Sequence, residues 1–114
     1  MIVTLYHNPK CSKSRETLEI IQALGIEPII VEYLKTPLSA EQIAVLICES
    51  GISVQQALRT DVEVYTQQVA GKTLSDEELI QLMAENPSLL NRPFASSSQG
   101  TRFCRPPELV KEIL

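Results

Sequence analysis

The sequence of 114 residues contains a single histidine, His7, and only three cysteines, which lie far apart: Cys11, Cys48 and Cys104. No group of these residues has the spacing of a zinc site, so we expect no structural metal. An odd number of cysteines in a chain without an export signal also argues against a disulfide framework. The thiols are therefore expected to be reduced.

Long apolar runs and an excess of positive charge are also missing. No run reaches the roughly 18 residues of a membrane span, and the apolar start, Met1–Tyr6, is too short for the core of a signal peptide. The net charge of −4 argues against a broad surface for nucleic acid or acidic membranes, so an anion site would have to be local. We therefore expect a cytoplasmic protein that binds neither nucleic acid nor membrane.

The start of the chain has the pattern of a β-α-β unit. Ile2–Tyr6 is an apolar, β-branched run that predicts a central strand buried on both faces. A helix is predicted next, with Ser12 as its N-cap and Gly25 at its end. Ile29–Val31 then predicts a second strand, parallel to the first.

The middle of the chain, about residues 39–86, predicts a helical insert. Three copies of the capping-box pattern, a serine followed three residues later by glutamine or glutamate, each predict the start of a helix: they begin at Ser39, Ser53 and Ser75. Gly51 is expected to end the first of these helices, and Asn86 with Pro87 the last.

After the insert the pattern returns to strands. Pro93–Ala95 and Thr101–Cys104 predict an antiparallel hairpin with Gly100 at its turn. A last helix is predicted from Pro106 and Pro107, with an apolar face made of Leu109, Val110, Ile113 and Leu114. This order predicts an α/β fold over one domain, residues 1–114: a thioredoxin-like mixed sheet with flanking helices and a helical insert between its β-α-β and β-β-α halves.

Cys11 lies where the first strand gives way to the first helix, in the stretch YHNPKCSKSR. A thiol with the usual pKa of about 8.5 is mostly protonated at neutral pH, so a reactive cysteine needs a lowered pKa. A helix start contributes about 0.3 to 1 kcal/mol to an exposed anion, and one pKa unit corresponds to about 1.4 kcal/mol. Several donors must therefore act together, and we expect Lys10, Lys13 and Arg15 to supply the charge. The same N–H groups could hold an oxyanion against the sulfur.

The neighbours of Cys11 exclude two kinds of thiol chemistry. A tyrosine-phosphatase loop needs an arginine six positions after the cysteine, where this sequence has Thr17. A dithiol redox site needs Cys-x-x-Cys, but its last position here is Ser14. Any partner thiol must come from elsewhere.

The remaining cysteines and the histidine each leave alternatives open. Cys48 falls on the apolar side of a predicted helix, so we expect a small core residue. Cys104 ends a strand, where it could pack in the core or act as a resolving thiol. His7 could be held by a backbone carbonyl, or it could orient or charge Cys11.

Motifs along almost the whole chain resemble one known family. Those near Cys11 are Tyr6–Pro9, Ser14–Arg15 and Thr17–Glu19, and those that follow are Gly51–Val54, Leu58–Arg59, Asn91–Pro93, Gly100–Arg102 and Cys104–Pro106. Their order and spacing resemble the glutaredoxin-linked arsenate reductases. Ser12 and Lys13 depart from the glycine and threonine of the best-known members, and Ala95–Gln99 is unusually rich in serine.

This resemblance implies reduction of arsenate to arsenite by a single cysteine thiolate, with glutathione as co-substrate, glutaredoxin as partner and no bound cofactor. It implies that Cys11 is the nucleophile, that His7 lies beside it and that Ser14 hydrogen-bonds the thiolate. It also implies a cis proline at Pro93 and three arginines that bind the oxyanion: Arg59, Arg92 and Arg105. Guanidinium groups suit this task because they bind a tetrahedral oxyanion through paired hydrogen bonds, although each arginine alone could be a solvated surface charge.

Two other functions are compatible with parts of the sequence. The Cys-x-x-Ser spacing of Cys11 and Ser14 is compatible with a related oxidoreductase that acts on glutathionylated proteins. A regulator branch of the same superfamily binds RNA polymerase, but it uses a Cys-x-x-Cys switch that Ser14 interrupts.

Overall fold

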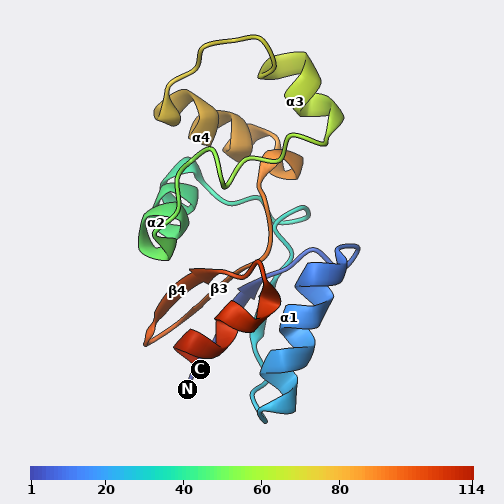
Figure 1. The fold of residues 1–114 in the computed structure, drawn as a ribbon, viewed down its shortest axis with the longest axis vertical. Helices are drawn as coiled ribbons and strands as arrows, with labels where there is room; N and C mark the ends of the chain where they lie inside the picture. Colours follow the sequence, from blue (N-terminus) through green and yellow to red (C-terminus); the bar gives the residue numbers. More distant parts are fainter.

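The two ends of the chain combine into one mixed four-stranded sheet in the computed structural model, which describes all residues from Met1 to Leu114 (Figure 1). The first half supplies a strand, a helix and a strand: β1 (Thr4–Tyr6), α1 (Ser12–Ala23) and β2 (Ile29–Val31). The second half supplies a hairpin and a 3-10 helix: β3 (Phe94–Ser97), β4 (Gly100–Phe103) and η2 (Pro107–Ile113). The predicted α/β fold with flanking helices is confirmed.

The strand order is β2-β1-β3-β4, with β1 parallel to β2 and antiparallel to β3. The prediction that the first strand is buried on both faces was wrong. Leu5 is fully buried, but Thr4 and Tyr6, which point to the opposite face, are only half-buried. The helix on that face, α2, packs against β4 rather than β1, so the β1 side stays partly open.

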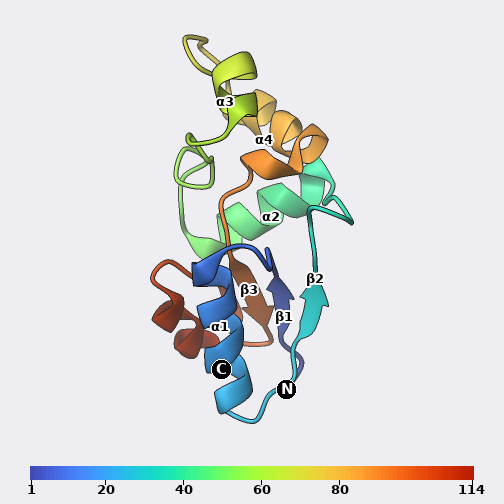
Figure 2. The ribbon, with the colours of Figure 1, turned by 90° about the vertical axis from the view of Figure 1, so that its right-hand side faces the viewer.

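Two apolar cores lie on opposite faces of the sheet. α1 and η2 cover one face (Figure 2), where seven buried residues, Leu5 and Ala95 among them, pack together. We call the other cluster the insert core; it consists of Tyr33, Leu38, Ile43, Leu46, Ile47, Val54, Ala57, Leu58, Val69, Leu79, Met83, Leu89, Leu90 and Phe94. The neighbours Phe94 and Ala95 belong to different cores because successive side chains of a strand point to opposite faces.

The helical insert lies above the sheet in Figure 1 and contains α2 (Ala40–Ser50), α3 (Glu63–Gln68), α4 (Asp76–Glu85) and a short 3-10 helix, η1 (Pro87–Leu89). α2 and α4 begin at the predicted capping boxes of Ser39 and Ser75. Gly51, with φ of 70°, ends α2 as predicted. None of the helices is both long and apolar enough to cross a membrane.

The capping box at Ser53 forms without a helix after it. Its two hydrogen bonds are present, from Ser53 N to Gln56 Oε1 at 2.8 Å and from Gln56 N to Ser53 Oγ at 3.1 Å. The backbone then pairs with a distant segment instead of continuing a helix, because Asn91 N donates to Ala57 O at 2.7 Å and Arg59 N to Leu89 O at 2.8 Å. The predicted helix is therefore wrong, and the pairing that replaces it fixes the position of Arg59.

Two further details differ from the predictions. Cys11, with extended φ and ψ of −95° and 124°, is the N-cap of α1 in place of Ser12. The last helix is a 3-10 helix, in which residues three apart share one side. Pro107, Val110 and Ile113 follow this spacing and are buried, whereas the expected face residues Leu109 and Leu114 are half-buried.

Removal of the α2 cap should weaken the fold measurably. We expect Ser39→Ala to lower the free energy of unfolding by about 1 kcal/mol, because the N–H of Gln42 loses its acceptor. Urea denaturation measures the change. Ser98→Ala, at an exposed turn position, is the control and should lie within about 0.5 kcal/mol of the wild type; equal effects of the two substitutions would contradict the expectation.

Candidate active site at the start of helix α1

The loop between β1 and α1 presents Cys11 at the first turn of the helix. The N–H of Cys11 donates to Asn8 O at 3.0 Å, and its carbonyl accepts from Arg15 N at 3.0 Å, which begins the helical bonding. No side chain caps α1. The N–H groups of its first turn are therefore left to the sulfur, as is typical of an anion-binding helix start.

The pKa of the Cys11 thiol is lowered, although the residue is only 7% exposed. Burial by itself raises this pKa, since it disfavours the thiolate. The hydrogen bond from the Ser14 backbone N–H, the charge of Arg92, the Lys13 backbone N–H and a hydrogen bond from the Arg92 side chain together outweigh burial. Two peptide N–H groups and one guanidinium group thus favour the thiolate form of Cys11.

The charge that stabilises Cys11 does not come from the local cations that we expected. Lys13 pairs with Glu16 at 3.5 Å, and the Arg15 guanidinium donates to Pro9 O at 2.9 Å. Lys13 contributes through its backbone N–H, and Arg92 is the cationic side chain that contributes most to lowering the pKa of Cys11. Proximity in the sequence was misleading because the side chains of Lys13 and Arg15 bond to Glu16 and Pro9 rather than to the sulfur.

Arg92 reaches the sulfur because of the sheet register. Tyr6 pairs with Phe94 in antiparallel strands, so the residues just after β1 lie opposite those just before β3. The Arg92–Pro93 peptide bond is cis, as the family resemblance implied. Arg92 Nε is buried and has no hydrogen-bond partner, while another guanidinium nitrogen contacts Asn91 Oδ1 at 3.3 Å. A buried, unpartnered, charged donor is costly, and such a group is typical of a ligand site.

Arg59 joins the same cluster through the pairing of residues 57–59 with residues 89–91. Its guanidinium group holds Asp61 with two contacts of 3.0 Å. Hydrogen bonding to Asp61 is the largest cause of the raised pKa of Arg59, and the charges of Tyr33 and Cys11 raise it further. The Arg59 side chain is 17% exposed while Asp61 is 65% exposed, so an entering anion could displace the carboxylate towards water.

Arg105 lies at the edge of this cluster. Its guanidinium group is exposed and donates to Arg92 O at 3.2 Å, which ties the end of the hairpin to the start of β3. No contact places it against Cys11. The structure therefore brings Arg59 and Arg92 together with the sulfur and leaves Arg105 beside the Arg92 backbone.

His7 and Ser14 form a buried pair behind the nucleophile. His7 Nδ1 and Ser14 Oγ are 2.7 Å apart, and Asn8 N donates to Ser14 Oγ at 3.0 Å. Burial lowers the pKa of His7, with an opposing effect of Glu32 and a smaller lowering by Arg15, so His7 is neutral at neutral pH. His7 contacts the hydroxyl of Ser14, and the backbone N–H of the same serine contributes to the lowered pKa of Cys11.

Two residues of the site were missed by the sequence analysis. Asn8 Oδ1 accepts from Lys10 N at 3.0 Å, so Asn8 shapes the turn that leads to Cys11. Asn-Pro is a turn signal in the sequence, and it could have singled out Asn8. Tyr33, 2% exposed, lies within reach of the charges of Arg92, Arg59 and Cys11, and no local pattern marks it.

The other two cysteines are poorly placed for thiol chemistry with Cys11. Cys48 is exposed, which contradicts the predicted core position: the buried face of α2 is Ile43, Leu46 and Ile47, and Cys48 lies one residue past it. Cys104 is fully buried, and burial raises the pKa of its thiol to about 12. Packing, rather than a resolving role, explains Cys104.

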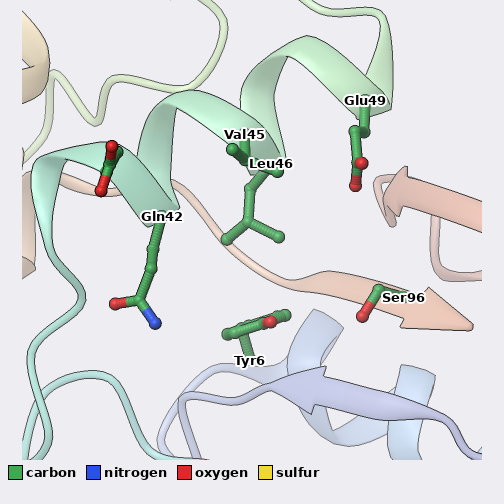
Figure 3. Close-up of a pocket in the computed structure, with 7 residues that line it drawn as sticks. Tyr6, Gln42, Val45, Leu46, Glu49 and Ser96 are labelled. Atoms are coloured by element: carbon green, nitrogen blue, oxygen red, sulfur yellow. The ribbon is translucent and has the colours of Figure 1, made fainter.

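One partly apolar groove lies away from Cys11. A groove of about 350 Å³ lies between α2 and the sheet, with Val45 and Leu46 on α2 and Tyr6 on β1 (Figure 3), and its lining includes Glu41 and Glu49. These two carboxylates disfavour an anion. The chain contains no group of three or more histidine, cysteine, aspartate or glutamate side chains placed to hold a metal ion.

Loss of Arg92 should make Cys11 less reactive. A unit charge contributes about 1 kcal/mol even in water-like surroundings, so Arg92→Gln should slow alkylation of Cys11 at pH 7 roughly fivefold and move its pH profile to higher pH. Iodoacetamide labelling with mass spectrometry of the Cys11 peptide measures this separately from Cys48. Arg102→Gln is the matched control, because Arg102 pairs with Glu112 at 2.8 Å; the same loss in both variants would contradict a specific role of Arg92.

Known proteins resemble this chain along almost its whole length. The model of the ArsC family matches residues 6–113. The arsenate reductase of Rhizobium meliloti (strain 1021) is 47% identical over 115 residues, which cover 100% of this chain and 82% of the relative. The arsenate reductase of Escherichia coli (strain K12) is 46% identical over 113 residues, 98% of this chain and 80% of the relative.

A solved structure, the arsenate reductase from Vibrio cholerae, has a TM-score of 0.93 with 43% identity and covers 100% of this chain and 98% of its own. The fold is therefore the thioredoxin-like arrangement that the element order predicted. The match of family model, sequence and structure over nearly the whole length shows that this chain belongs to the ArsC family.

Proposed function

We propose that this protein reduces arsenate to arsenite, with Cys11 as the nucleophile. One observation carries the proposal: a thiol of lowered pKa lies beside Arg92, whose buried Nε has no partner. A tetrahedral oxyanion would supply the missing acceptor and bring an electrophilic atom to the sulfur. Relatives that bear the name arsenate reductase support arsenate as this oxyanion.

The three arginines have different roles in the proposed reaction. Arg92 and Arg59 hold the oxyanion, and Arg59 does so after it exchanges Asp61 for the substrate. Arg105 is near enough to close over the site, because its guanidinium group already contacts the Arg92 backbone. His7 and Ser14 position the sulfur from behind.

The reaction then needs two thiols. The Cys11 thiolate displaces one oxygen from arsenic(V), which leaves as water after protonation. The glutathione thiolate then attacks the Cys11 sulfur, which forms a disulfide bond and breaks the sulfur–arsenic bond. The electron pair of that bond reduces arsenic(V) to arsenic(III), so arsenite departs and a mixed disulfide joins Cys11 to glutathione. Glutaredoxin reduces that disulfide and restores the Cys11 thiol.

The second thiol comes from outside the chain in this mechanism. Ser14 occupies the position of a local partner, Cys104 is buried with a pKa of about 12, and Cys48 is exposed on α2. These placements support glutathione as co-substrate, and a glutathione-dependent reaction fits a reducing cytoplasm. Reduction of glutathionylated proteins is the second candidate, supported by the same Cys11 and Ser14 arrangement.

Arsenite formation with glutathione and glutaredoxin should depend on Cys11 alone among the cysteines. We expect Cys11→Ser to abolish activity, whereas Cys48→Ser retains it, because the Cys48 thiol is exposed on α2 and takes no part in the site. Arsenite is measured in a coupled assay with each thiol omitted in turn. Activity that survives Cys11→Ser, or that needs no external thiol, would refute this mechanism.

The two candidate functions respond differently to loss of an arginine. Arg92→Lys keeps the charge and loses the planar fork, so kcat/KM for arsenate should fall at least about tenfold. The rate at which this variant removes glutathione from a glutathionylated peptide should change little, because no oxyanion is bound in that reaction. If both activities collapse together, or if only the second is present, the arsenate proposal fails.

A further inference from the structure

A small hollow adjoins the loop that carries Cys11, at the carboxyl ends of the parallel strands β1 and β2. The two loops continue the pairing of these strands, because His7 N donates to Val31 O at 2.8 Å. In open α/β sheets, ligands bind outside the carboxyl ends of the strands, so the hollow lies where a ligand is expected. Its volume is about 190 Å³, and its lining consists of His7–Lys10 from the first loop and Glu32, Leu34 and Lys35 from the second.

Side chains of both charges line this hollow. Lys10 and Lys35 are exposed, and Glu32 is half-buried. Lys35 Nζ lies 3.5 Å from Glu32 Oε1, but the Lys35 side chain is 78% exposed, so this ion pair is weak and the ammonium group can turn to another partner. The backbone beneath them is held in a turn, since the N–H groups of Lys35 and Thr36 both donate to Glu32 O at 2.9 Å.

The charges of the hollow match those of glutathione. Glutathione carries a carboxylate at each end and an ammonium group beside the γ-glutamyl carboxylate. Lys10 and Lys35 can each bind a carboxylate, and Glu32 can accept hydrogen bonds from the ammonium group. An oxyanion such as arsenate has no positive group, and the carboxylate of Glu32 would repel it. The hollow therefore suits a zwitterionic peptide thiol better than it suits the oxyanion.

The hollow is also within reach of Cys11. Lys10 directly precedes Cys11, and consecutive Cα atoms are about 3.8 Å apart. An extended tripeptide spans about 10 Å. A glutathione molecule that is held by the two lysines can therefore extend its thiol as far as the Cys11 loop.

We propose that this hollow is the glutathione subsite, in which Lys10 and Lys35 bind the carboxylates and Glu32 binds the ammonium group. The inference rests on the proposed function for its role in arsenate reduction, where it gives the second thiol a place to bind. From this subsite the glutathione thiolate attacks the Cys11 sulfur of the arsenic adduct. The sulfur–sulfur bond forms as the sulfur–arsenic bond breaks, and the electron pair of the broken bond stays with arsenic.

Thiol–disulfide exchange tests the subsite without arsenate. The Cys11 thiolate attacks one sulfur of oxidised glutathione, so that a mixed disulfide forms and glutathione thiolate leaves. Cys48→Ser serves as the background, because it removes the other thiol that is exposed. Hydroxyethyl disulfide, which carries no charge, is the reference reagent. The ratio of the two exchange rates, measured by mass spectrometry of the Cys11 peptide, cancels any change in the sulfur itself.

Loss of the two lysines should lower this ratio. We expect Lys10→Gln and Lys35→Gln to lower it about threefold each and about tenfold together, because each variant loses one exposed charge pair with the ligand. The double variant should also raise the KM for glutathione in arsenite formation and leave the KM for arsenate unchanged. Lys72→Gln is the matched control, since Lys72 is an exposed lysine between α3 and α4, and it should leave the ratio at the wild-type value.

The outcomes separate the subsite from the proposed function. A double variant with the wild-type ratio would overturn the inference, and so would an equal fall in Lys72→Gln, which would show a general effect of positive charge. If the wild type forms no arsenite with any thiol, the proposed function fails, whereas the exchange ratio still decides whether the hollow binds glutathione.

Discussion

The candidate active site depends on one electrostatic arrangement: a largely buried sulfur whose thiolate form is favoured by its surroundings. Burial opposes the thiolate, and a helix start alone contributes only about 0.3 to 1 kcal/mol at an exposed site. The backbone N–H groups of Ser14 and Lys13 act together with the guanidinium group of Arg92 to lower the pKa of Cys11. The position of Arg92 is therefore as important for the nucleophile as the position of Cys11 itself.

The mixed sheet provides that position. Antiparallel pairing of β1 with β3 sets the loop after Tyr6 opposite the residues before Phe94. The segment around Leu58 then pairs with the segment around Leu90, so Arg59 arrives at the same end of the sheet. The helical insert has a structural purpose here: its core carries both arginines, while the other face of the sheet carries α1 and the sulfur.

Local signals were reliable where the physical cause is local. The capping boxes at Ser39 and Ser75 and the stop at Gly51 were predicted correctly, because a helix end is decided by hydrogen bonds within four residues. The capping box at Ser53 forms its hydrogen bonds, but no helix follows it. The backbone of residues 57–59 pairs with residues 89–91 instead of continuing a helix. Cys48 was misplaced by a single residue, which on a helix turns a side chain by about 100°.

The sequence by itself determined the α/β class, the order of the elements and the cysteine at the corner before α1, because each follows from periodicity and turn chemistry within short windows. Only the tertiary structure decided which cation lies beside the sulfur, that Arg105 lies at the edge of the cluster, and that Tyr33 lies near the charges of the site. Those contacts join residues far apart in the chain. They are set by strand register and by the packing of the two cores, which no short stretch of sequence encodes.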